Sequence, residues 1–318
     1  MHAAMVEDFS QPPRYRETSV PVAKEGEVLV KVRAAALSNL VRAQANGSHY
    51  SSPKKLPFTP GNDGVGVISE DNERVYFFSP RAPYGSMAEY CVVPKAQTIP
   101  VPANIDDVDA AALGNPGLAT WGSLLGRAKL QAGEAVLING ATGVAGRQAI
   151  QVAKYLGASK IIATGRSDRA LRELEVLGAN ETISLKQTEE DLLRSFRSTL
   201  PDVQVVLDFL WGPSAELILK AAAGHGASDG EPRIRFVQIG SMSAGTITLP
   251  AEVLRSSGVE LLGSGLGSLS SQQILQSLRA MFAAASAVQF AINVDPVPLS
   301  KVEKVWPRKE EQRIVFVP

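Results

Sequence analysis

Cysteine is almost missing from this chain, because Cys91 is the single cysteine among 318 residues. One thiol cannot form a disulfide within the chain, and it excludes a cysteine-rich zinc site. An excess of charge of either sign is also missing, since 32 Lys and Arg residues balance 32 Asp and Glu residues. A neutral chain has no overall field to hold nucleic acid or an anionic membrane. We therefore expect neither of them as a partner.

Long apolar runs are missing as well. No stretch reaches the ~20 consecutive apolar residues that span a bilayer. The acidic residues Glu7 and Asp8 come too early for a secretory signal. Apolar residues make up 45% of the chain and charged residues 20%, which allows a sizeable core and argues against disorder. We expect a soluble cytoplasmic protein, most typically an enzyme that acts on small molecules.

The first part of the chain, to about residue 115, has the pattern of a β-rich unit. Val28, Val30 and Val32 alternate with Leu29, Lys31 and Arg33, as expected of a strand. Further strands are predicted over 63–68, 74–78 and 88–93. Short strands with frequent turn signals suggest a barrel-like or open antiparallel unit.

The middle of the chain changes rhythm near Pro116. Residues 135–138 form a short continuous apolar run, typical of a strand that is buried on both faces. Strands and helices then alternate, which predicts right-handed crossovers and a doubly wound parallel sheet in an α/β fold. The predicted strands are 135–138, 160–163, 182–185, 203–209, 234–239 and 259–263, and the helices between them are 144–156, 168–177, 189–198 and 214–223. A helix over 271–284 and strands near 288–294 and 313–317 are expected to follow.

A glycine-rich turn joins the first buried strand to its helix. It reads Gly140-Ala141-Thr142-Gly143-Val144-Ala145-Gly146. One glycine permits a tight turn, a second lets a pyrophosphate approach the backbone, and a third lets helix and strand pack closely. The helix N-terminus adds unpaired amides and the positive end of a dipole. The expected ligand is a dinucleotide held by Gly140, Thr142, Gly143, Val144, Ala145 and Gly146; the alternative is a tight turn that binds nothing.

The residues after the second strand indicate which dinucleotide binds. An acidic residue there would bind the ribose hydroxyl of NAD, whereas a basic residue would accommodate the 2′-phosphate of NADP. No Asp or Glu occurs between Arg147 and Ser167. The strand ends in Gly165, Arg166 and Ser167, with Arg169 close behind, so NADP(H) is favoured. Asp168 is interpreted as a first-turn residue of the next helix, capped by Ser167.

The order of these segments resembles the medium-chain dehydrogenase/reductase superfamily, in particular its zinc-independent quinone oxidoreductase branch, which includes zeta-crystallin. The matching segments are Pro60-Gly61-Asn62-Asp63-Gly64-Val65-Gly66-Val67, then Pro116-Gly117-Leu118-Ala119-Thr120, then the glycine turn, and the resemblance covers nearly the whole chain. It implies a GroES-like catalytic domain (1–116, with 266–318 returning to it) and a Rossmann NADP-binding domain (117–265). It also implies dimers or tetramers formed through the edge of the Rossmann sheet, and of these we expect a homodimer.

The same resemblance bears on zinc and on catalysis. Zinc-dependent members carry a Gly-His-Glu triplet where this chain has Gly61-Asn62-Asp63, and they carry a cysteine early in the chain that is absent here. No catalytic metal is therefore expected. Asn39 matches an Asn that the family places beside nicotinamide and substrate, and the alternative is that it caps a helix over 40–45. Tyr50 is the second catalytic candidate, or a ring without chemistry, while His49 is interpreted as a residue of a surface loop.

On the nicotinamide side, residues at the ends of the later strands are expected to line the cofactor. Glycines there permit close approach of a ligand to the backbone. Thr120 is added from the resemblance, with the alternative that it is merely an N-terminal helix residue. These candidates are Thr120, Gly240, Ser241, Gly263 and Leu266.

The predicted activity is NADPH-dependent, zinc-independent hydride transfer to a quinone or an α,β-unsaturated carbonyl compound. Two alternatives stay open. The first is an enoyl-thioester reductase, for which Lys54 and Lys55 would be rim residues. The second is a non-enzymatic NADPH-binding protein, which the Gln at position 44 favours slightly because many relatives carry a Tyr there.

Overall fold

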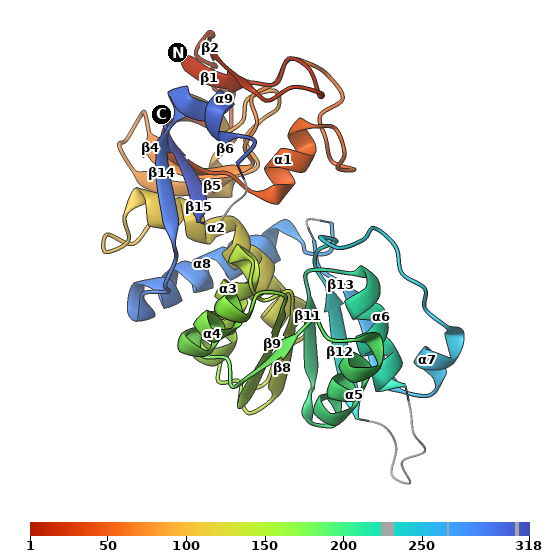
Figure 1. Cartoon of the computed structure of the whole chain (residues 1–318). Coiled ribbons are helices and arrows are strands. Elements are labelled where there is room, and N and C mark those ends of the chain that lie inside the picture. Colours follow the sequence, from red (N-terminus) through yellow and green to blue (C-terminus); the bar gives the residue numbers. More distant parts are fainter. Residues whose placement is uncertain (224–231, 266, 309–311) are drawn as a thin grey trace. The chain divides into compact units, whose positions relative to one another are not determined.

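The computed structural model describes residues 1–223, 232–265, 267–308 and 312–318, and the chain divides into two compact units. Unit 1 comprises Met1–Asn115 and Leu278–Pro318, and unit 2 comprises Pro116–Ser277. Two helices, α2 (Asp107–Trp121) and α8 (Ser271–Val288), contain the points where the chain passes from one unit to the other (Figure 1).

Unit 1 is built on a mainly antiparallel sheet in the order β14-β15-β3-β4-β5-β7, with β6 pairing to β3 and with β1 and β2 forming a separate pair. Its strands are β1 (His2–Met5), β2 (Arg14–Glu17), β3 (Glu27–Ala36), β4 (Asp63–Ile68), β5 (Arg74–Phe78), β6 (Tyr90–Pro94), β7 (Thr98–Pro100), β14 (Val294–Pro298) and β15 (Arg313–Val317). Its own helices are α1 (Asn39–Ala45) and α9 (Val302–Val305), with 3-10 turns η1 (Lys95–Gln97) and η4 (Leu299–Lys301).

Buried and exposed residues alternate along β3, which shows how this strand contributes to the core of unit 1. Val28, Val30 and Val32 are buried, whereas Lys31 and Arg33 are exposed, because successive side chains of a strand point to opposite faces. The last strand, β15, pairs with β3 on one side and β14 on the other. The end of the chain thereby completes the sheet that its beginning started.

The strand expected near 288–294 is wrong. Helix α8 continues to Val288, and β14 begins only at Val294. The segment 283–288 reads Ala-Ala-Ala-Ser-Ala-Val, and its alanines are the strongest helix formers. The sequence pattern did not predict β14 because this strand contains Pro296 and Pro298. The strand lies at the edge of the sheet, where proline is tolerated.

Unit 2 contains a sheet in which every described pairing is parallel, in the order β10-β9-β8-β11-β12-β13. Its strands are β8 (Ala135–Asn139), β9 (Lys160–Gly165), β10 (Glu181–Ser184), β11 (Val205–Asp208), β12 (Arg233–Gln238) and β13 (Gly258–Gly263). Its helices are α3 (Val144–Tyr155), α4 (Asp168–Leu177), α5 (Glu189–Thr199), α6 (Gly212–Ala222) and α7 (Ala251–Arg255), with a π-helical segment η2 (Gly122–Arg127) and a 3-10 turn η3 (Leu200–Asp202).

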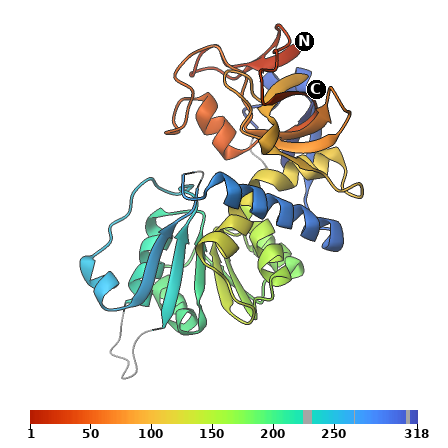
Figure 2. The same ribbon diagram turned by 180° about the vertical axis from the view of Figure 1, so that it is seen from behind.

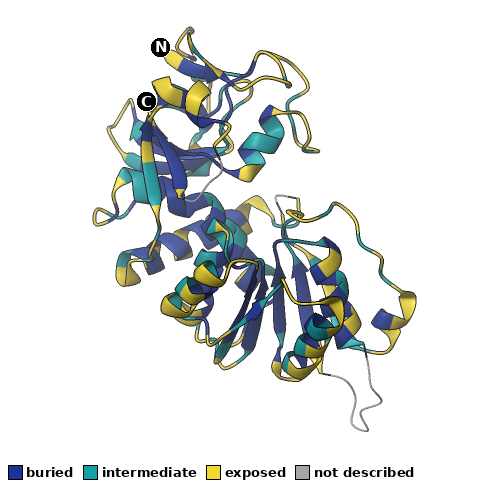
Figure 3. Ribbon diagram, viewed as in Figure 1, coloured by how far each residue is buried: buried dark blue, intermediate teal, exposed yellow. Residues whose placement is uncertain are grey.

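This strand order is that of the doubly wound dinucleotide-binding fold, so the predicted fold class is confirmed. Helices α3 and α4 pack together, as do α5 and α6, and the two pairs lie on opposite faces of the sheet (Figures 1 and 2). Figure 3 shows the central strands of the sheet buried and the outer helix faces exposed. Every residue of β8 is buried, which explains its unbroken apolar run.

Helix ends in unit 2 follow the glycine signals in the sequence. Gly178 is the C-cap of α4 with φ 121°, and Gly157, just after α3, has φ 83°. Both values lie in the left-handed region, which a glycine adopts without a Cβ penalty. In the described part of the chain, no helix is both long and apolar enough to cross a membrane.

Candidate functional site

Three glycines shape the turn between β8 and α3. Gly140 has φ 86°, a value that suits glycine. A Cβ on Gly146 would lie 2.5 Å from the Cα of Ala141, so this glycine lets the helix approach the turn. Gly143 differs from both, since its φ is −74° and a Cβ there would meet nothing within 4 Å. The backbone at Gly143 is therefore open to an approaching ligand.

The amides of the turn divide into two groups. Gly140 donates to Oγ1 of Thr164 at 3.0 Å, and Ala141 donates to the backbone oxygen of Thr164 at 2.9 Å. The helix that follows begins at Val144 with Gly143 as its N-cap, so no side chain caps it. The first amides of a helix have no intrahelical partner and carry the positive end of the dipole. The start of α3 is therefore suited to an anion.

A buried polar network lies directly behind this turn. The hydroxyl of Thr164 donates to Oδ1 of Asn139 at 2.8 Å, and Nδ2 of Asn139 donates to Asp208 at 2.8 Å and to Ser214 Oγ at 2.9 Å. Asn139, Thr164 and Asp208 are fully buried and end, or nearly end, strands β8, β9 and β11. Carboxyl ends of parallel strands meet at one edge of the sheet, which is where ligands bind in this fold.

Asp208 connects this network to two further segments. Its carboxylate accepts the amides of Leu210 at 3.1 Å and Trp211 at 3.1 Å, and its backbone oxygen accepts those of Ile239 at 2.8 Å and Gly240 at 3.2 Å. Burial raises the pKa of Asp208, while these donors and Asn139 act in the opposite direction. Our sequence reasoning missed the network, although a polar residue at or near the end of each of three buried strands was the available signal.

The end of β9 places the residues that were expected to select the cofactor. A Cβ on Gly165 would lie 2.4 Å from Cγ2 of Thr142, so Gly165 and the glycine turn are neighbours. Arg166 is exposed. Ser167 is the N-cap of α4, and its hydroxyl accepts the Ala170 amide at 3.3 Å. The interpretation of Asp168 as a first-turn residue is thereby confirmed.

Arg147 was not predicted, and it belongs to this group. Its Nε donates to the backbone oxygen of Thr142 at 3.1 Å, and its guanidinium pairs with Glu173 at 2.6 Å. Glu173 also pairs with Arg169 at 3.2 Å, and the two guanidiniums hold the pKa of Glu173 below its usual value. The side of the turn near Gly165 is therefore rich in guanidinium groups.

The candidates expected on the nicotinamide side are placed as follows. Gly240 packs closely on the backbone of Phe209, Ser241 is exposed, and Gly263 ends β13 with open space at its Cβ position. Leu266 lies outside the described residues. Thr120 is fully buried and donates to the backbone oxygen of Gly117 at 3.2 Å. The alternative that Thr120 begins a helix is wrong, because it is the second-last residue of α2.

In unit 1, the cap of α1 differs from the expected one. Ser38 is the N-cap, and its hydroxyl accepts the Val41 amide at 3.1 Å, so the alternative that Asn39 caps this helix is wrong. Serine competes successfully because its short hydroxyl reaches the third amide of the first turn. Asn39 is the first residue of α1, and Tyr50 is 84% exposed with its ring 4.1 Å from that of His49.

Polar residues near α1 form a directed chain of hydrogen bonds. Asn62 Nδ2 donates to Gln44 Oε1 at 2.7 Å, and Gln44 Nε2 donates to Ser51 Oγ at 2.9 Å. Ser51 Oγ lies 2.7 Å from Nδ1 of His49. These hydrogen bonds connect Asn62 with His49, the histidine beside Tyr50. Asn62 stands where the zinc-dependent proteins carry a metal-binding histidine.

Asp63, the residue after Asn62, is occupied elsewhere. It is buried and accepts the hydroxyl of Tyr76 at 2.8 Å, beside the guanidinium of Arg313. Burial raises the pKa of Asp63 to about 6, although Tyr76, Arg313 and the Asn115 amide oppose the rise. Among the residues that the structure describes, no three His, Cys, Asp or Glu side chains gather in a group that could hold a metal ion.

Comparison with known proteins places the chain in a family. A model of the zinc-binding dehydrogenase family matches residues 145–283. A probable NADPH-dependent quinone reductase of Emericella nidulans is 29% identical over the whole of both chains. The chain belongs to the medium-chain dehydrogenase/reductase superfamily.

Other superfamily members add detail. The chloroplastic NADPH-dependent alkenal/one oxidoreductase of Arabidopsis thaliana is 36% identical over 54% of this chain and 49% of its own. The quinone oxidoreductase of Thermus thermophilus, whose structure was also solved with NADPH, superposes with a TM-score of 0.81 at 24% identity, over the whole of both chains. That second likeness shows the shared fold.

Proposed function

We propose that this chain is an NADPH-dependent, zinc-independent oxidoreductase that transfers a hydride to a quinone or an α,β-unsaturated carbonyl compound. The observation that carries the proposal is the uncapped start of α3, where Gly143 leaves open space above the backbone. The names of the relatives from Emericella nidulans and Arabidopsis thaliana support the same cofactor and these two acceptor classes.

The residues present fit a dinucleotide. The amides of Val144, Ala145 and Gly146 would bind the pyrophosphate, because helix N-termini favour phosphate groups. Just after the neighbouring strand β9, Arg166 would bind the 2′-phosphate, supported by Ser167 and Arg169. Gly140 has a different role in this proposal, because its amide donates to Thr164 and it therefore shapes the turn. Gly143 is the glycine whose backbone would contact the phosphate.

When bound, NADPH supplies a hydride, which takes two electrons and one hydrogen to the acceptor and leaves NADP⁺. Addition of one proton then yields the hydroquinone or the saturated carbonyl compound. The protein's part is to hold the acceptor in line, to exclude water and to stabilise the negative charge that develops on oxygen. Asn39 and Tyr50 are our candidates for residues that contact the acceptor.

The absence of zinc from the mechanism rests on chemistry at positions 62 and 63. Asn62 is a poor zinc ligand compared with thiolate, imidazole or carboxylate. Asp63 is the acceptor of the Tyr76 hydroxyl and lies beside Arg313. An acceptor that is already activated, such as a quinone or an enone, needs no metal to polarise it.

We further propose a cytoplasmic homodimer. Strand β13 lies at one edge of the parallel sheet. Its residues are exposed or partly exposed, and Leu261 is 40% exposed. An unpaired strand edge with apolar side chains is a surface that a second copy can cover. The only cysteine is buried, which is compatible with a reducing compartment.

The variant Gly143→Ala tests the phosphate site. Because a Cβ at this position meets nothing in the protein and φ is ordinary, the variant should keep its unfolding free energy to within about 0.5 kcal/mol. A methyl group in the path of the pyrophosphate should instead weaken NADPH binding at least about tenfold, measured by nicotinamide fluorescence. Unchanged NADPH binding would contradict the proposed site.

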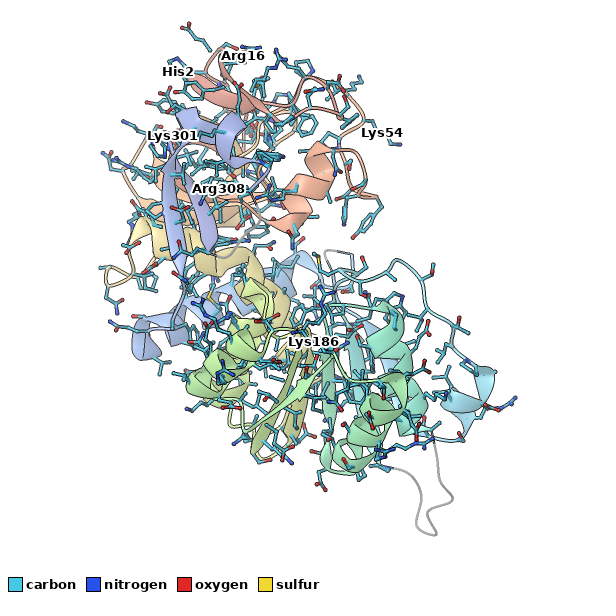
Figure 4. The ribbon with its side chains drawn as sticks, viewed as in Figure 1. His2, Arg16, Lys54, Lys186, Lys301 and Arg308 are labelled. Atoms are coloured by element: carbon cyan, nitrogen blue, oxygen red, sulfur yellow. The ribbon has the colours of Figure 1, made fainter. Side chains whose placement is uncertain are left out.

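Turnover is tested separately, by the loss of NADPH absorbance with panels of quinones, enones, enals and enoyl thioesters. Oxidation with quinones or enones is the expected result. Turnover confined to enoyl thioesters would shift the function to the thioester reductase, and the exposed Lys54, which extends from its loop in Figure 4, would then be a rim residue. NADPH binding without turnover on any acceptor would favour the non-enzymatic alternative.

A further inference from the structure

Glu173 is shared by two arginines that come from two different helices. Its Oε2 pairs with the guanidinium of Arg147 in α3 at 2.6 Å, and its Oε1 accepts Nε of Arg169 in α4 at 3.2 Å. The hydrogen bond from Arg147, reinforced by Arg169, holds the pKa of Glu173 below its usual value. The side chain is therefore a carboxylate at neutral pH, and all three residues belong to unit 2.

The two arginines are held to different degrees. Arg147 also donates from Nε to the backbone oxygen of Thr142 at 3.1 Å, and its side chain is 31% exposed. Arg169 lies four residues before Glu173 on the same helix, and its side chain is 87% exposed. An exposed ion pair of this kind is weak. Arg147 therefore fixes the carboxylate of Glu173, whereas Arg169 can exchange that carboxylate for another anion.

The position of Arg169 is not explained by the stability of its helix. Arg169 is the second residue of α4, and the first turn of a helix carries the positive end of the dipole, which disfavours a cation. Glu173 follows Arg169 in the less favourable order for a pair four residues apart. An anionic ligand would explain this arginine, because an anion benefits from the guanidinium and the dipole together.

The surroundings of Arg169 indicate the adenosine end of the dinucleotide as that ligand. Arg166, which the proposed function assigns to the 2′-phosphate, precedes Arg169 by three residues. Thr142, which Arg147 holds, belongs to the glycine turn, and its Cγ2 would lie 2.4 Å from a Cβ on Gly165. These charges therefore lie beside both segments that are proposed to bind the phosphates.

We propose that Glu173 limits how tightly NADP(H) is held, by competing with the 2′-phosphate for Arg169. In the free protein the carboxylate holds Arg169; when NADPH binds, the phosphate takes that guanidinium, and Arg147 keeps Glu173 in place. A phosphate monoester carries about two negative charges and three acceptor oxygens, so it can displace a carboxylate, whereas the hydroxyl of NADH cannot.

The inference rests on the proposed function and names a residue that regulates the same cofactor site. After hydride transfer, Glu173 would take Arg169 back from the 2′-phosphate and so promote the departure of NADP⁺. Release of the product limits the turnover of many reductases and other enzymes. A built-in competitor for one of the phosphate's partners would therefore favour exchange of the cofactor over its retention.

Adenosine 2′,5′-bisphosphate and adenosine 5′-monophosphate are suitable probes, because they differ only in the 2′-phosphate. The ratio of their dissociation constants, measured by isothermal titration calorimetry, isolates that phosphate, since any disturbance of the glycine turn affects both. We expect Glu173→Gln to favour the bisphosphate about three- to fivefold more than the wild type does, which is what removal of one exposed competing charge is worth. Glu175→Gln, the same change of charge on the same helix, is the matched control and should leave the ratio unchanged.

A second variant tests whether the competition acts through Arg169. Arg169→Gln should lower the preference for the bisphosphate at least about threefold, because one exposed guanidinium is lost. In that background, Glu173→Gln should no longer raise the preference, since two residues that act through one contact have non-additive effects. A gain as large as in the wild-type background would overturn the exchange at Arg169.

The outcomes distinguish this inference from the proposed function. If the wild type binds the bisphosphate no better than the monophosphate, the proposed NADPH site fails, and the role of Glu173 fails with it. If the wild type prefers the bisphosphate but Glu173→Gln leaves that preference unchanged or lowers it, only the role of Glu173 is overturned. A lower preference would mean that the carboxylate presents Arg169 to the phosphate instead of competing for it.

Discussion

Thr164 holds two successive amides of the glycine turn with two different oxygens. Its hydroxyl oxygen accepts the hydrogen of Gly140 at 3.0 Å, and its carbonyl oxygen accepts that of Ala141 at 2.9 Å. The hydroxyl hydrogen in turn goes to Asn139 at 2.8 Å. Strand β9 therefore sets the shape of a turn that belongs to strand β8.

Thr164→Val should disturb the turn without changing the size of the side chain. The substitution leaves the Gly140 amide and Oδ1 of Asn139 without this partner in a buried site, which costs about 1–3 kcal/mol of unfolding free energy. NADPH affinity should fall as well. Urea unfolding and nucleotide fluorescence measure the two effects. Thr164→Ser, which keeps the hydroxyl, is the control and should stay close to the wild type.

Asp208→Asn should be destabilising even though it removes a buried charge. All the hydrogen-bonding neighbours of the carboxylate are donors: Asn139 and the amides of Leu210 and Trp211. An amide nitrogen at position 208 must face one of them, so about 1–3 kcal/mol should be lost. The same change at the exposed Asp202 should cost less than about 0.5 kcal/mol. Equal effects at both positions would contradict the network.

Gly146→Ala tests close packing rather than ligand approach. Its Cβ would lie 2.5 Å from Cα of Ala141, and backbone on both sides leaves little room to adjust. We expect a loss of about 1–3 kcal/mol in unfolding free energy. Gly143→Ala is the matched variant, one turn earlier, and is expected to be as stable as the wild type. A stable Gly146→Ala protein would show that the helix can move away from the turn.

Arg166→Ala tests the choice of cofactor. Removing a guanidinium that binds the 2′-phosphate should raise the KM for NADPH at least about tenfold and leave the KM for NADH unchanged. Steady-state kinetics with both cofactors give the comparison. Arg172→Ala, an exposed change on α4, should alter neither value. A parallel rise for NADPH and NADH would place Arg166 away from the phosphate.

Asp63 should make unit 1 less stable as the pH rises through the mildly acidic range. The native carboxyl keeps its proton up to a pKa of about 6, whereas the ordinary value is 3.8. The native state binds more protons between these values, so its stability falls as pH rises from one to the other. From about pH 5 to pH 7 the loss is about 1.4 kcal/mol.

Asp63→Asn should remove that dependence. Urea unfolding of both proteins at the two pH values gives the measurement. The variant should gain about 1.4 kcal/mol relative to the wild type between about pH 5 and pH 7, whatever its own stability. If the difference between the two proteins is the same at both pH values, the carboxyl does not titrate in this range.

Local patterns were enough to predict much of the fold. The buried run at β8, the helix-ending glycines 157 and 178, and the regular alternation identified the parallel sheet, because each pattern depends on neighbours in sequence. The strand β14 could not be predicted, because its two prolines are tolerated only at an edge that the sequence does not mark. The alanines before it favour helix wherever they stand.

The candidate site shows the same division. The glycine turn and the cap at Ser167 follow from residues next to each other in the chain. The link from Thr164 to Asn139 and on to Asp208 spans three strands, and Arg147 meets Glu173 from another helix. Such partners depend on strand order and helix packing. The sequence patterns could therefore indicate where polar residues stand, but not which residues they contact.

The prolines of β14 also affect self-association. Pro296 and Pro298 have no N–H to donate, and β14 is an outermost strand of its sheet. A strand from another molecule that tried to extend the sheet here would find two of the donors missing. This edge therefore resists the growth of the sheet from one molecule into the next, and so it protects the protein against aggregation on that side.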